Sequence, residues 1–422
     1  MDEEKEIIAD LHIHSKYSRA TSKSLDIPNL VKWARIKGLD LLGTGDFTHP
    51  EWLKSLKENL KEKNGLLWYE DEKGDFPFIL SSEISLIFTQ EEKGRRVHLV
   101  FLAPSFEVVD KINEYLDSKG RRDYDGRPIF GMTCEEFVKE MMDISKDIEV
   151  IPAHIWTPWF GVFGSKGGFD SLKEAFREQV DNIHAIETGI SSDPEMNVKI
   201  KELNDRNISI ISFSDCHSFW PWRLGREATI FTGELSYKNI LKQIRENSFK
   251  STIETDPAYG KYHWDGHRNC GFSCSPAKTK ELEGKCPKCH KPLIIGVEYR
   301  VEELADKTKE KESTSIFAVK APVKPKKFYK LLPLHELISF SLGVGVNSKS
   351  VWKVYDELID KFENEYNLLL KVDKNILMKE LHNNEKLLNL IIDNRIGNIK
   401  INPGYDGEYG RIVMKDEQVR LF

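Results

Sequence analysis

The first residues along the chain whose types and spacing could do chemistry are two histidines one residue apart. His12 and His14 lie at the end of a short apolar run that begins at Ile7. Side chains at positions i and i+2 of a strand point to the same face, so both imidazoles can reach one ion. Neutral imidazole is a common ligand for Zn, Mn and Fe. The pair alone is weak evidence, because many such pairs are ordinary surface or core histidines.

Later parts of the chain supply further imidazoles and carboxylates, each close to an apolar run. These candidate metal ligands are Asp46, His49, Glu83, His98, His154, Asp215 and His217. A glutamate that can bridge two ions, surrounded by histidine and aspartate, is typical of hydrolases with several metals. In such sites the metals lower the pKa of a water molecule and neutralise a phosphoryl oxygen. The set therefore predicts metal-dependent hydrolysis, with Asp215 and His217 also candidates for a direct catalytic role.

Short strands and helices must position these residues. Apolar runs predict strands at 7–12, 39–44, 78–80, 97–102, 148–152, 183–187, 208–213 and 228–231, with helices between or after most of them. Such alternation favours an α/β fold with a parallel sheet, open or closed into a barrel. The candidate ligands follow the ends of these strands, where barrel enzymes build their active sites. This shared position is stronger evidence than any single residue.

Two further groups have both a structural and a functional interpretation. Asp193 precedes Pro194 and is suited to cap a helix, but it could also lie near a scissile phosphate as a catalytic residue. Trp156, Trp159 and Trp222 lie within a few residues of candidate ligands. Such aromatic rings could stack on exposed bases, or simply pack in loops.

Four cysteines form a second, separate motif. Cys270, Cys274, Cys286 and Cys289 have two short spacings around a turn, which predicts one structural zinc ion held by four thiolates. His263, His267 and His290 are alternative ligands nearby, whereas Cys134 and Cys216 are expected to be small apolar residues. Basic residues of this module, among them Arg268 and Lys288, suggest contact with nucleic acid.

The distribution of charge and composition suggests where domains begin. The first 250 residues contain 34 Lys/Arg and 43 Asp/Glu, and the remaining residues contain 28 and 25. We expect a barrel at 1–250, the zinc module at 251–300, a basic Pro/Lys-rich linker at 301–332, and a helical domain at 333–422 that contacts DNA. No apolar run is long enough for a membrane span and the acidic N-terminus is unlike a signal peptide. We therefore expect a cytoplasmic, nucleoid-associated protein.

The order of the histidine and carboxylate motifs resembles that of the polymerase-and-histidinol-phosphatase (PHP) superfamily. The resemblance implies a distorted seven-stranded βα barrel with two or three catalytic divalent metals (Zn, Mn or Mg) at its mouth. It assigns His12, His14, Glu83 and Asp215 to one metal, and Glu83, His98 and His154 to another. A third metal would involve His217 and the Asp46/His49 region, although Phe47 stands where the family often has histidine. Asp10 would orient a ligand histidine.

The whole arrangement of barrel, cysteine module and helical domain resembles the endonuclease Q family, as does the stretch Pro403–Gly410. The resemblance implies DNA repair, with hydrolysis by a metal-activated water on the 5′ side of deaminated bases (hypoxanthine, uracil, xanthine) or abasic sites. Damaged double- or single-stranded DNA would be the partner. The last residues, 417–422, are a candidate tail for docking a sliding clamp or another repair protein.

Two other functions stay open. One is a small-molecule phosphomonoesterase like the histidinol phosphatases, although such a substrate needs neither a zinc module nor a helical domain. The other is an inactive adaptor that binds DNA, although the main ligand set is complete here.

Overall fold

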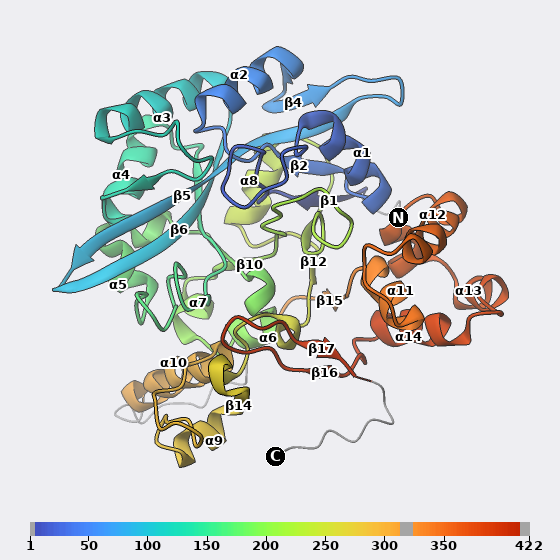
Figure 1. The fold of residues 1–422 in the computed structure, drawn as a ribbon. Helices are drawn as coiled ribbons and strands as arrows, with labels where there is room; N and C mark the ends of the chain where they lie inside the picture. The colour runs from blue at the N-terminus through green and yellow to red at the C-terminus, as the bar shows by residue number, and fades with distance from the viewer. Residues whose placement is uncertain (1–4, 313–323, 414–422) are drawn as a thin grey trace.

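The computed structural model describes residues 5–312 and 324–413. An α/β barrel forms most of the molecule, and a small hairpin module and a helical C-terminal domain lie on different sides of it (Figure 1). The candidate tail at 417–422 lies outside the described residues. None of the described helices is long and apolar enough to cross a membrane.

Seven strands form the ring of the barrel. They are β1 (Glu6–Asp10), β2 (Leu41–Gly43), β5 (Phe76–Gln90), β6 (Lys93–Ala103), β8 (Glu149–Pro152), β9 (Ala185–Glu187) and β10 (Ser209–Ile211). From β1 to β8, neighbours in this order pair directly, as do β9 and β10. Ile155 N donates to Glu187 O at 3.0 Å between the β8 and β9 chains, and a bridge between Ile13 and Cys216 closes the ring. The predicted seven-stranded barrel is confirmed.

The ring is more distorted than the predicted parallel sheet. The pairs β5–β6 and β6–β8 are antiparallel, because β5 and β6 form one long hairpin through a tight turn at Gln90–Lys93. The strands β11 (Ala228–Thr232), β12 (Ser251–Glu254) and β15 (Phe328–Lys330) add a second row that begins on β1. The strands β3 (Lys61–Lys63), β4 (Leu66–Tyr69) and β7 (Ile129–Phe130) are attached to β5 directly or through one another.

Helices cover the outside of the barrel and follow from local sequence signals. They include α1 (Ile27–Lys37), α2 (Pro50–Asn59), α3 (Phe106–Lys119), α4 (Cys134–Ile144), α5 (Leu172–Phe176), α7 (Lys201–Asp205) and α8 (Tyr237–Arg245). Asp26, Ser105, Thr133, Ser171 and Ser236 accept backbone N–H groups as N-caps, which satisfies donors that the first helical turn leaves free. Helix α8 then buries residues spaced three and four apart, as an amphipathic helix does.

Two predicted boundaries differ from the structure. Residues 251–254 are β12 and belong to the barrel sheet rather than to the cysteine module. The predicted linker at 301–332 instead contains most of helix α10 (Val297–Glu312) and strand β15, which pairs in parallel with β12. Composition misled here, because lysine and glutamate are good helix formers as well as linker residues. Arg300 also anchors α10 by donating to Phe163 O at 3.1 Å and to Asp170 at 2.6 Å.

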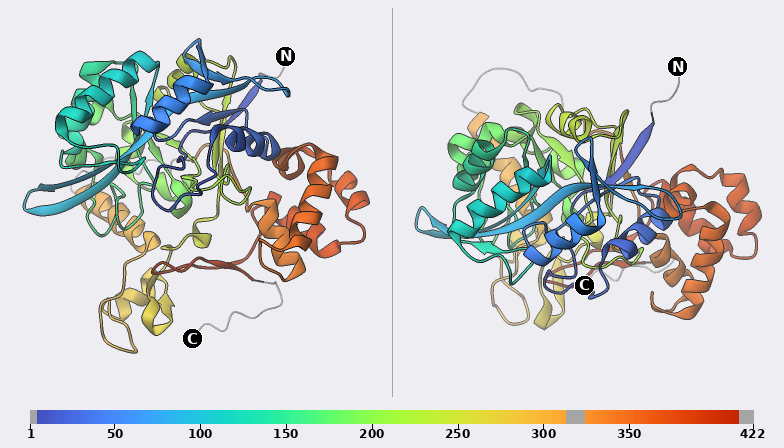
Figure 2. Two further views of the ribbon diagram at one scale, coloured as in Figure 1. Left: turned by 45° about the horizontal axis from the view of Figure 1, so that its top comes forward. Right: turned by 90° about the horizontal axis from the view of Figure 1, so that it is seen from above.

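The other two parts are small. The module consists of the hairpin β13 (Asp265–His267) and β14 (Phe272–Cys274) with α9 (Pro276–Glu281). The C-terminal domain contains α11 (Leu334–Leu342), α12 (Lys349–Phe362), α13 (Lys374–Glu380) and α14 (Glu385–Arg395). After α14, the short pair β16 (Ile401–Asn402) and β17 (Arg411–Ile412) runs back toward the hairpin module, as two further views also show (Figure 2).

A buried ion pair joins the C-terminal domain to the barrel. Lys37 Nζ lies 2.7 Å from Glu365 Oε1, and both side chains are nearly inaccessible. Lys37 also donates to Pro221 O at 2.8 Å, and Tyr355 donates to Glu365 Oε2 at 2.9 Å. Leu334 N donates to the same carboxylate at 3.0 Å. The charges are thus saturated with partners, which is the condition for keeping them buried.

We expect Lys37→Met to destabilise the protein by about 3–5 kcal/mol, because it leaves Glu365 charged and buried without its cation. The free energy of unfolding in urea would measure this. The double variant Lys37→Met/Glu365→Leu should recover a large part of the loss, since it removes both charges. A change below about 1 kcal/mol in the single variant would show that the pair does not hold the interface.

Candidate metal centre

The candidate ligands meet at one end of the barrel because the ring strands deliver them there. His12 and His14 follow β1, Asp46 follows β2, His154 follows β8 and Asp215 follows β10. Gly43 allows the ends of β1 and β2 to approach closely, since a Cβ atom there would lie 2.3 Å from the carbonyl oxygen of Leu11. Glu83 and His98 come from the middle of the long strands β5 and β6.

The structure gathers a first group of four side chains at this mouth. The ligand atoms of His12, His14, Glu83 and Asp215 all lie within 4.8 Å of one another. His14 Nε2 is 3.2 Å from Glu83 Oε2 and 3.0 Å from Asp215 Oδ1. His12 Nε2 lies 3.6 Å from both of these carboxylates. Two imidazole nitrogens and two carboxylate oxygens around one point suit a divalent transition metal.

A second group shares Glu83 with the first. His98 Nδ1 lies 2.8 Å from Glu83 Oε1, and His154 Nε2 lies 3.3 Å from the same oxygen. Glu83 thus directs one oxygen at each group, and its side chain is fully buried. Burial lowers the pKa of His98 to about 4 even beside Glu83. The ring is therefore neutral at pH 7, as a metal ligand must be.

Two buried carboxylates hold the ligand histidines from behind. Glu187 accepts from His12 Nδ1 at 2.8 Å and from the backbone N–H of His154 at 2.7 Å. Asp46 accepts from His14 Nδ1 at 2.9 Å. A carboxylate on the far nitrogen of a histidine fixes the ring orientation and raises its basicity as a ligand. Glu187 was not among the predicted site residues, although its place at the end of a predicted strand was the available signal.

One observation tests whether the first group fits a metal ion. His12 Nε2 is buried and has no hydrogen-bond partner among the described residues, although it points at two carboxylates. Burial alone would lower the pKa of His12, but Glu187, Asp215 and Glu83 raise it well above its ordinary value. The carboxylates therefore call for positive charge at this nitrogen, and a divalent cation supplies it. The donor set fits a metal ion.

Strained backbone accompanies the site. Asp46, His154 and Asp215 have φ angles of 47°, 29° and 47°, a region that non-glycine residues seldom adopt. Each of these residues lies two to four positions after a strand of the ring, in the segment that leaves the barrel mouth. Such strain is found where the surrounding structure holds a functional geometry in place.

The region predicted for a third metal is arranged differently. The carboxylate of Asp46 accepts hydrogen bonds from His14 Nδ1, from Ser15 N and Oγ at 2.6 Å, and from Ser18 Oγ at 2.9 Å. His49 stacks on Tyr17 with ring centres 4.3 Å apart. His217 lies beside the first group, with its ring 4.6 Å from that of His14. Among the described residues, Asp46, His49 and His217 form no joint group.

Asp10 and Asp193 accept hydrogen bonds from backbone N–H groups rather than from a histidine. Asp10 accepts from Ser214 N and Gly225 N, both at 2.9 Å, so it does not orient a ligand as predicted. Asp193 caps α6 (Pro194–Asn197) by accepting from Met196 N at 2.9 Å. Its other oxygen lies 2.8 Å from Lys330 Nζ. The structure favours the capping interpretation of Asp193 over the catalytic one.

Arg127 contacts the metal-binding region but was not predicted. Its Nη1 lies 2.9 Å from Glu83 Oε2, and its side chain is 23% exposed. It lies on the loop between α3 and β7, away from the strands that the sequence predicts, so no local pattern marked it. The side chains of Asp215 and His217 are exposed to 25% and 31%. These three side chains are therefore the parts of the site that a substrate can reach.

The tryptophans proposed to stack on DNA are mostly packed inside the protein. Trp156 is 1% exposed and donates to Asn197 Oδ1 at 2.8 Å, so it is a core residue. Trp222 is 8% exposed and stacks on Trp220 and on His335 of the C-terminal domain. The predicted stacking of Trp156 and Trp222 on DNA is wrong, because both rings are buried by packing within the protein. Trp159 is half-buried, 5.7 Å from the ring of Tyr262.

The module gathers three of the four predicted thiols together with a histidine. His267, Cys270, Cys286 and Cys289 have their ligand atoms within 4.8 Å of one another. Cys274 Sγ instead lies 3.3 Å from Thr279 Oγ1. In the hairpin, His267 pairs with Phe272 next to the turn, whereas Cys274 pairs with Asp265, two residues further from the turn. Burial would raise the pKa of Cys286, but backbone N–H groups and His267 lower it to about 6, which favours the thiolate.

Arg268 and Lys288 of the module are exposed. Lys288 Nζ donates to Cys270 O at 2.9 Å, and Arg268 N donates to Asp406 Oδ2 at 2.7 Å. Arg268 Nε also lies 4.0 Å from Glu408 Oε1. Contact of these two residues with nucleic acid stays a prediction.

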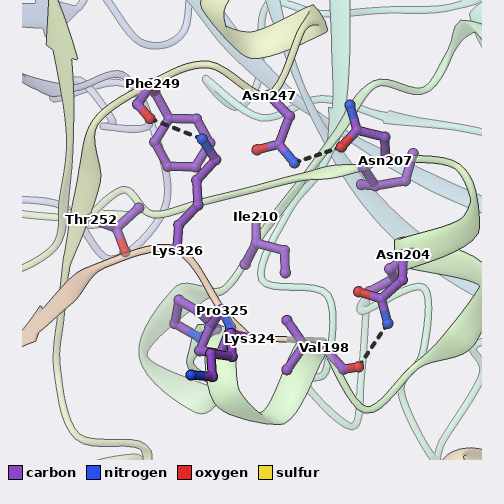
Figure 3. A pocket seen from close by; sticks show the side chains of 13 residues that line it. Val198, Asn204, Asn207, Ile210, Asn247, Phe249, Thr252, Lys324, Pro325 and Lys326 are labelled. Carbon is purple, nitrogen blue, oxygen red and sulfur yellow. Dashed lines mark hydrogen bonds between the residues drawn. The ribbon is translucent and has the colours of Figure 1, made fainter. Parts of the chain in front are cut away.

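A separate hollow lies at the other end of β10. Figure 3 shows its wall, where Ile210, Phe249, Pro325 and Lys326 meet several asparagines. Asn247 donates to Asn207 at 3.1 Å, and Lys326 donates to Phe249 O at 3.1 Å. No histidine, cysteine, aspartate or glutamate lines this hollow within the described part of the chain, so it offers no set of metal ligands.

Known proteins resemble this chain over part or all of its length. A family described as the MJ0043 C-terminal domain matches residues 333–398. The uncharacterized protein MJ0043 of Methanocaldococcus jannaschii is 34% identical over 273 residues, which are 63% of this chain. This chain spans 32% of the length of that relative.

Two solved structures match nearly the whole fold. The lesion-specific endonuclease PfuEndoQ from Pyrococcus furiosus has a TM-score of 0.83 and 30% identity, covering 98% of this chain and 96% of its own. The structure of endonuclease Q bound to a 27-mer duplex with an abasic lesion at the active site has a TM-score of 0.82 and 30% sequence identity, and the match covers 98% of each chain. Barrel, module and helical domain are thus matched together, which confirms the resemblance predicted from the sequence. This chain belongs to the endonuclease Q family.

Proposed function

We propose that this protein is a DNA repair endonuclease that cuts the phosphodiester bond on the 5′ side of a deaminated base (hypoxanthine, uracil or xanthine) or of an abasic site. The observation that carries the proposal is the pair of ligand groups sharing Glu83, within a fold that matches endonuclease Q over 98% of the chain. The matching complex with an abasic duplex supports DNA as the partner. These comparisons give no support for a sliding clamp.

Two divalent metals fit the site that the side chains form. His12, His14, Glu83 and Asp215 would hold one, and Glu83, His98 and His154 the other. Such metals lower the pKa of water and neutralise phosphoryl oxygens. Glu83 separates the two positions by using a different oxygen for each. Glu187 and Asp46 keep the two N-terminal histidines in the orientation that directs Nε2 at the first position.

The accessible side chains complete the proposed reaction. Water adds to phosphorus, the bond to the 3′ oxygen breaks, and the products carry a 3′-hydroxyl and a 5′-phosphate. Arg127 presents a permanent positive charge to the phosphate, because its pKa is raised and its side chain is partly exposed. Guanidinium groups bind phosphate oxygens through paired N–H donors. His217 lies where it could exchange a proton with the leaving oxygen, 4.6 Å from the ring of His14.

We further propose that the module holds one structural zinc ion through His267, Cys270, Cys286 and Cys289. Three sulfur ligands and one nitrogen ligand form a closed tetrahedral set. The hairpin has few apolar residues of its own, with Leu293 and the cysteines at its centre. Metal binding would then supply much of the folding energy of the module.

A nicking assay tests the proposed function. With a labelled duplex that contains one deoxyinosine, we expect a single cut on its 5′ side in the presence of Mg²⁺, Mn²⁺ or Zn²⁺, and none with EDTA. An undamaged duplex and p-nitrophenyl phosphate serve as controls. Hydrolysis of the small ester alone would instead indicate a phosphomonoesterase, and binding of DNA without any cleavage would indicate an adaptor.

Asp215→Asn tests the first metal group. We expect cleavage to fall by roughly 100-fold or more, because losing even an outer partner of a metal ligand costs 10–100-fold. DNA binding should stay within about threefold of the wild type, since Asp215 repels phosphate rather than attracting it. Asp143→Asn, on the outside of α4 and 57% exposed, is the matched control. Nicking at the wild-type rate by Asp215→Asn would remove this residue from the metal site.

Cys286→Ser tests the structural zinc. We expect the purified variant to lose about one zinc per chain by elemental analysis and to unfold at a lower temperature. Cys274→Ser should retain the zinc, because its thiol faces Thr279, and His267→Gln should lose it. The reverse result, with zinc lost in Cys274→Ser and kept in His267→Gln, would favour the four-thiolate set.

A further inference from the structure

The segment Pro403–Gly410 between β16 and β17, which we call the strap, runs from the C-terminal domain back across the barrel to the hairpin module (Figures 1 and 2). Backbone hydrogen bonds seat it on the barrel loop at 257–261. Gly404 N, Gly407 N and Gly410 N donate to Ala258 O, Lys261 O and Tyr259 O at 2.9, 3.0 and 3.0 Å. The contact is so close that a Cβ atom on Gly404 would lie 2.1 Å from Gly260 O. The strap is therefore a fixed part of the fold.

The strap carries one large side chain that remains at the surface. Tyr409 is 38% exposed, although its backbone neighbours are seated on the barrel. Lys261 Nζ lies 4.6 Å from the centre of its ring, and the guanidinium carbon of Arg223 lies 5.7 Å from it. Arg226 hydrogen-bonds to its hydroxyl group. Three cations from two separate loops thus surround one accessible aromatic ring.

Acidic residues balance these cations only in part: Glu227 and Asp215 interact with Arg226. Neither Arg223 nor Lys261 forms an ion pair with any residue that the structure describes. Glu336 of α11 lies in the same region, hydrogen-bonds to Tyr259 and attracts both Arg223 and Arg226, so one carboxylate faces three cations. Burial would raise the pKa of Tyr409, yet Arg226, Arg223 and Lys261 lower it. The surface around the ring is therefore positive and suited to an anion.

A short series of contacts connects this surface to the metal centre. Arg226 Nε donates to Ser214 O at 3.1 Å, and Ser214 directly precedes Asp215 of the first ligand group. Arg223 and Arg226 themselves lie on the chain that leaves the barrel mouth after β10. Tyr409 is therefore connected to the first ligand group through the side chain of Arg226.

We propose that Tyr409, Arg223 and Lys261 bind a nucleotide of the DNA strand adjoining the scissile phosphate, with the ring of Tyr409 stacked on a base and the two cations on phosphates. Aromatic platforms beside positive charge are the usual means of holding a nucleic acid strand without reading its sequence. Part of the substrate site is then supplied from the far end of the chain. The inference rests on the proposed function, since it takes DNA as the substrate.

The test measures equilibrium binding by fluorescence anisotropy with EDTA present, so that no cleavage occurs. Abasic and intact duplexes are compared at several salt concentrations. We expect Tyr409→Leu to weaken binding by roughly 5- to 100-fold at each salt concentration, as loss of a stacking ring does, without changing the salt slope. Tyr409→Phe keeps the ring and should bind within about threefold of the wild type.

Arg223→Gln and Lys261→Gln should each lower the slope of log K against log salt by about one, since each removes one phosphate contact. Lys327→Gln is the matched control, because Lys327 also lies over a tyrosine ring, at 4.7 Å from Tyr329, but on the β15 side of the barrel. Its slope should equal that of the wild type. Unchanged slopes in both cation variants, or wild-type affinity of Tyr409→Leu, would overturn the inference.

The outcomes separate this inference from the proposed function. If the wild type neither binds nor nicks damaged duplex, the proposed function itself fails. If the wild type nicks but the three variants bind and nick as it does, only the role of the strap fails. Should Tyr409→Leu prove unfolded by its melting curve, the salt slopes of the two cation variants decide.

Discussion

The charge of Glu83 is the constraint on which the rest of the barrel mouth depends. Its side chain is fully buried, and an ionised carboxylate in that position is very costly unless it is surrounded by compensating groups. His14, His98, His154 and Arg127 lie within 3.3 Å of its two oxygens. His98, Arg127 and His12 lower its pKa well below the ordinary value despite burial. A charge held in this way can bridge two cations.

The compensation has a consequence for the geometry of the strands. Partners must reach Glu83 from β1, β6 and β8 at once, so a flat sheet cannot supply them. Closing the ring through Ile13 and Cys216 brings the two ends together. His154 and Asp215, just beyond β8 and β10, have left-handed backbone where they join the ligand groups. The distorted barrel and its strained corners are thus requirements of one buried carboxylate.

Sequence patterns predicted those residues whose role depends on their own position in a strand. His12, His14, Glu83, His98, His154 and Asp215 all lie at the mouth of the barrel. Residues whose role depends on packing were missed or misjudged. Arg127 reaches Glu83 from a loop distant in the sequence, and the ring of Trp222 packs against His335 of the C-terminal domain. Spacing could not distinguish Cys274 from His267, because the hairpin register decides which side chain lies at the turn.

The linker shows the same limit at the level of domains. The charged and Pro/Lys-rich composition of residues 301–332 predicts a linker, yet 301–312 belong to helix α10, which Arg300 anchors by bonds to the loop after β8. The strap likewise has a turn-rich composition that fits a loose tail, whereas its glycines allow it to lie directly against the barrel. In both cases the decisive contacts join residues more than 100 positions apart. Local composition reports the conformations that a segment can adopt, and only these distant partners select one of them.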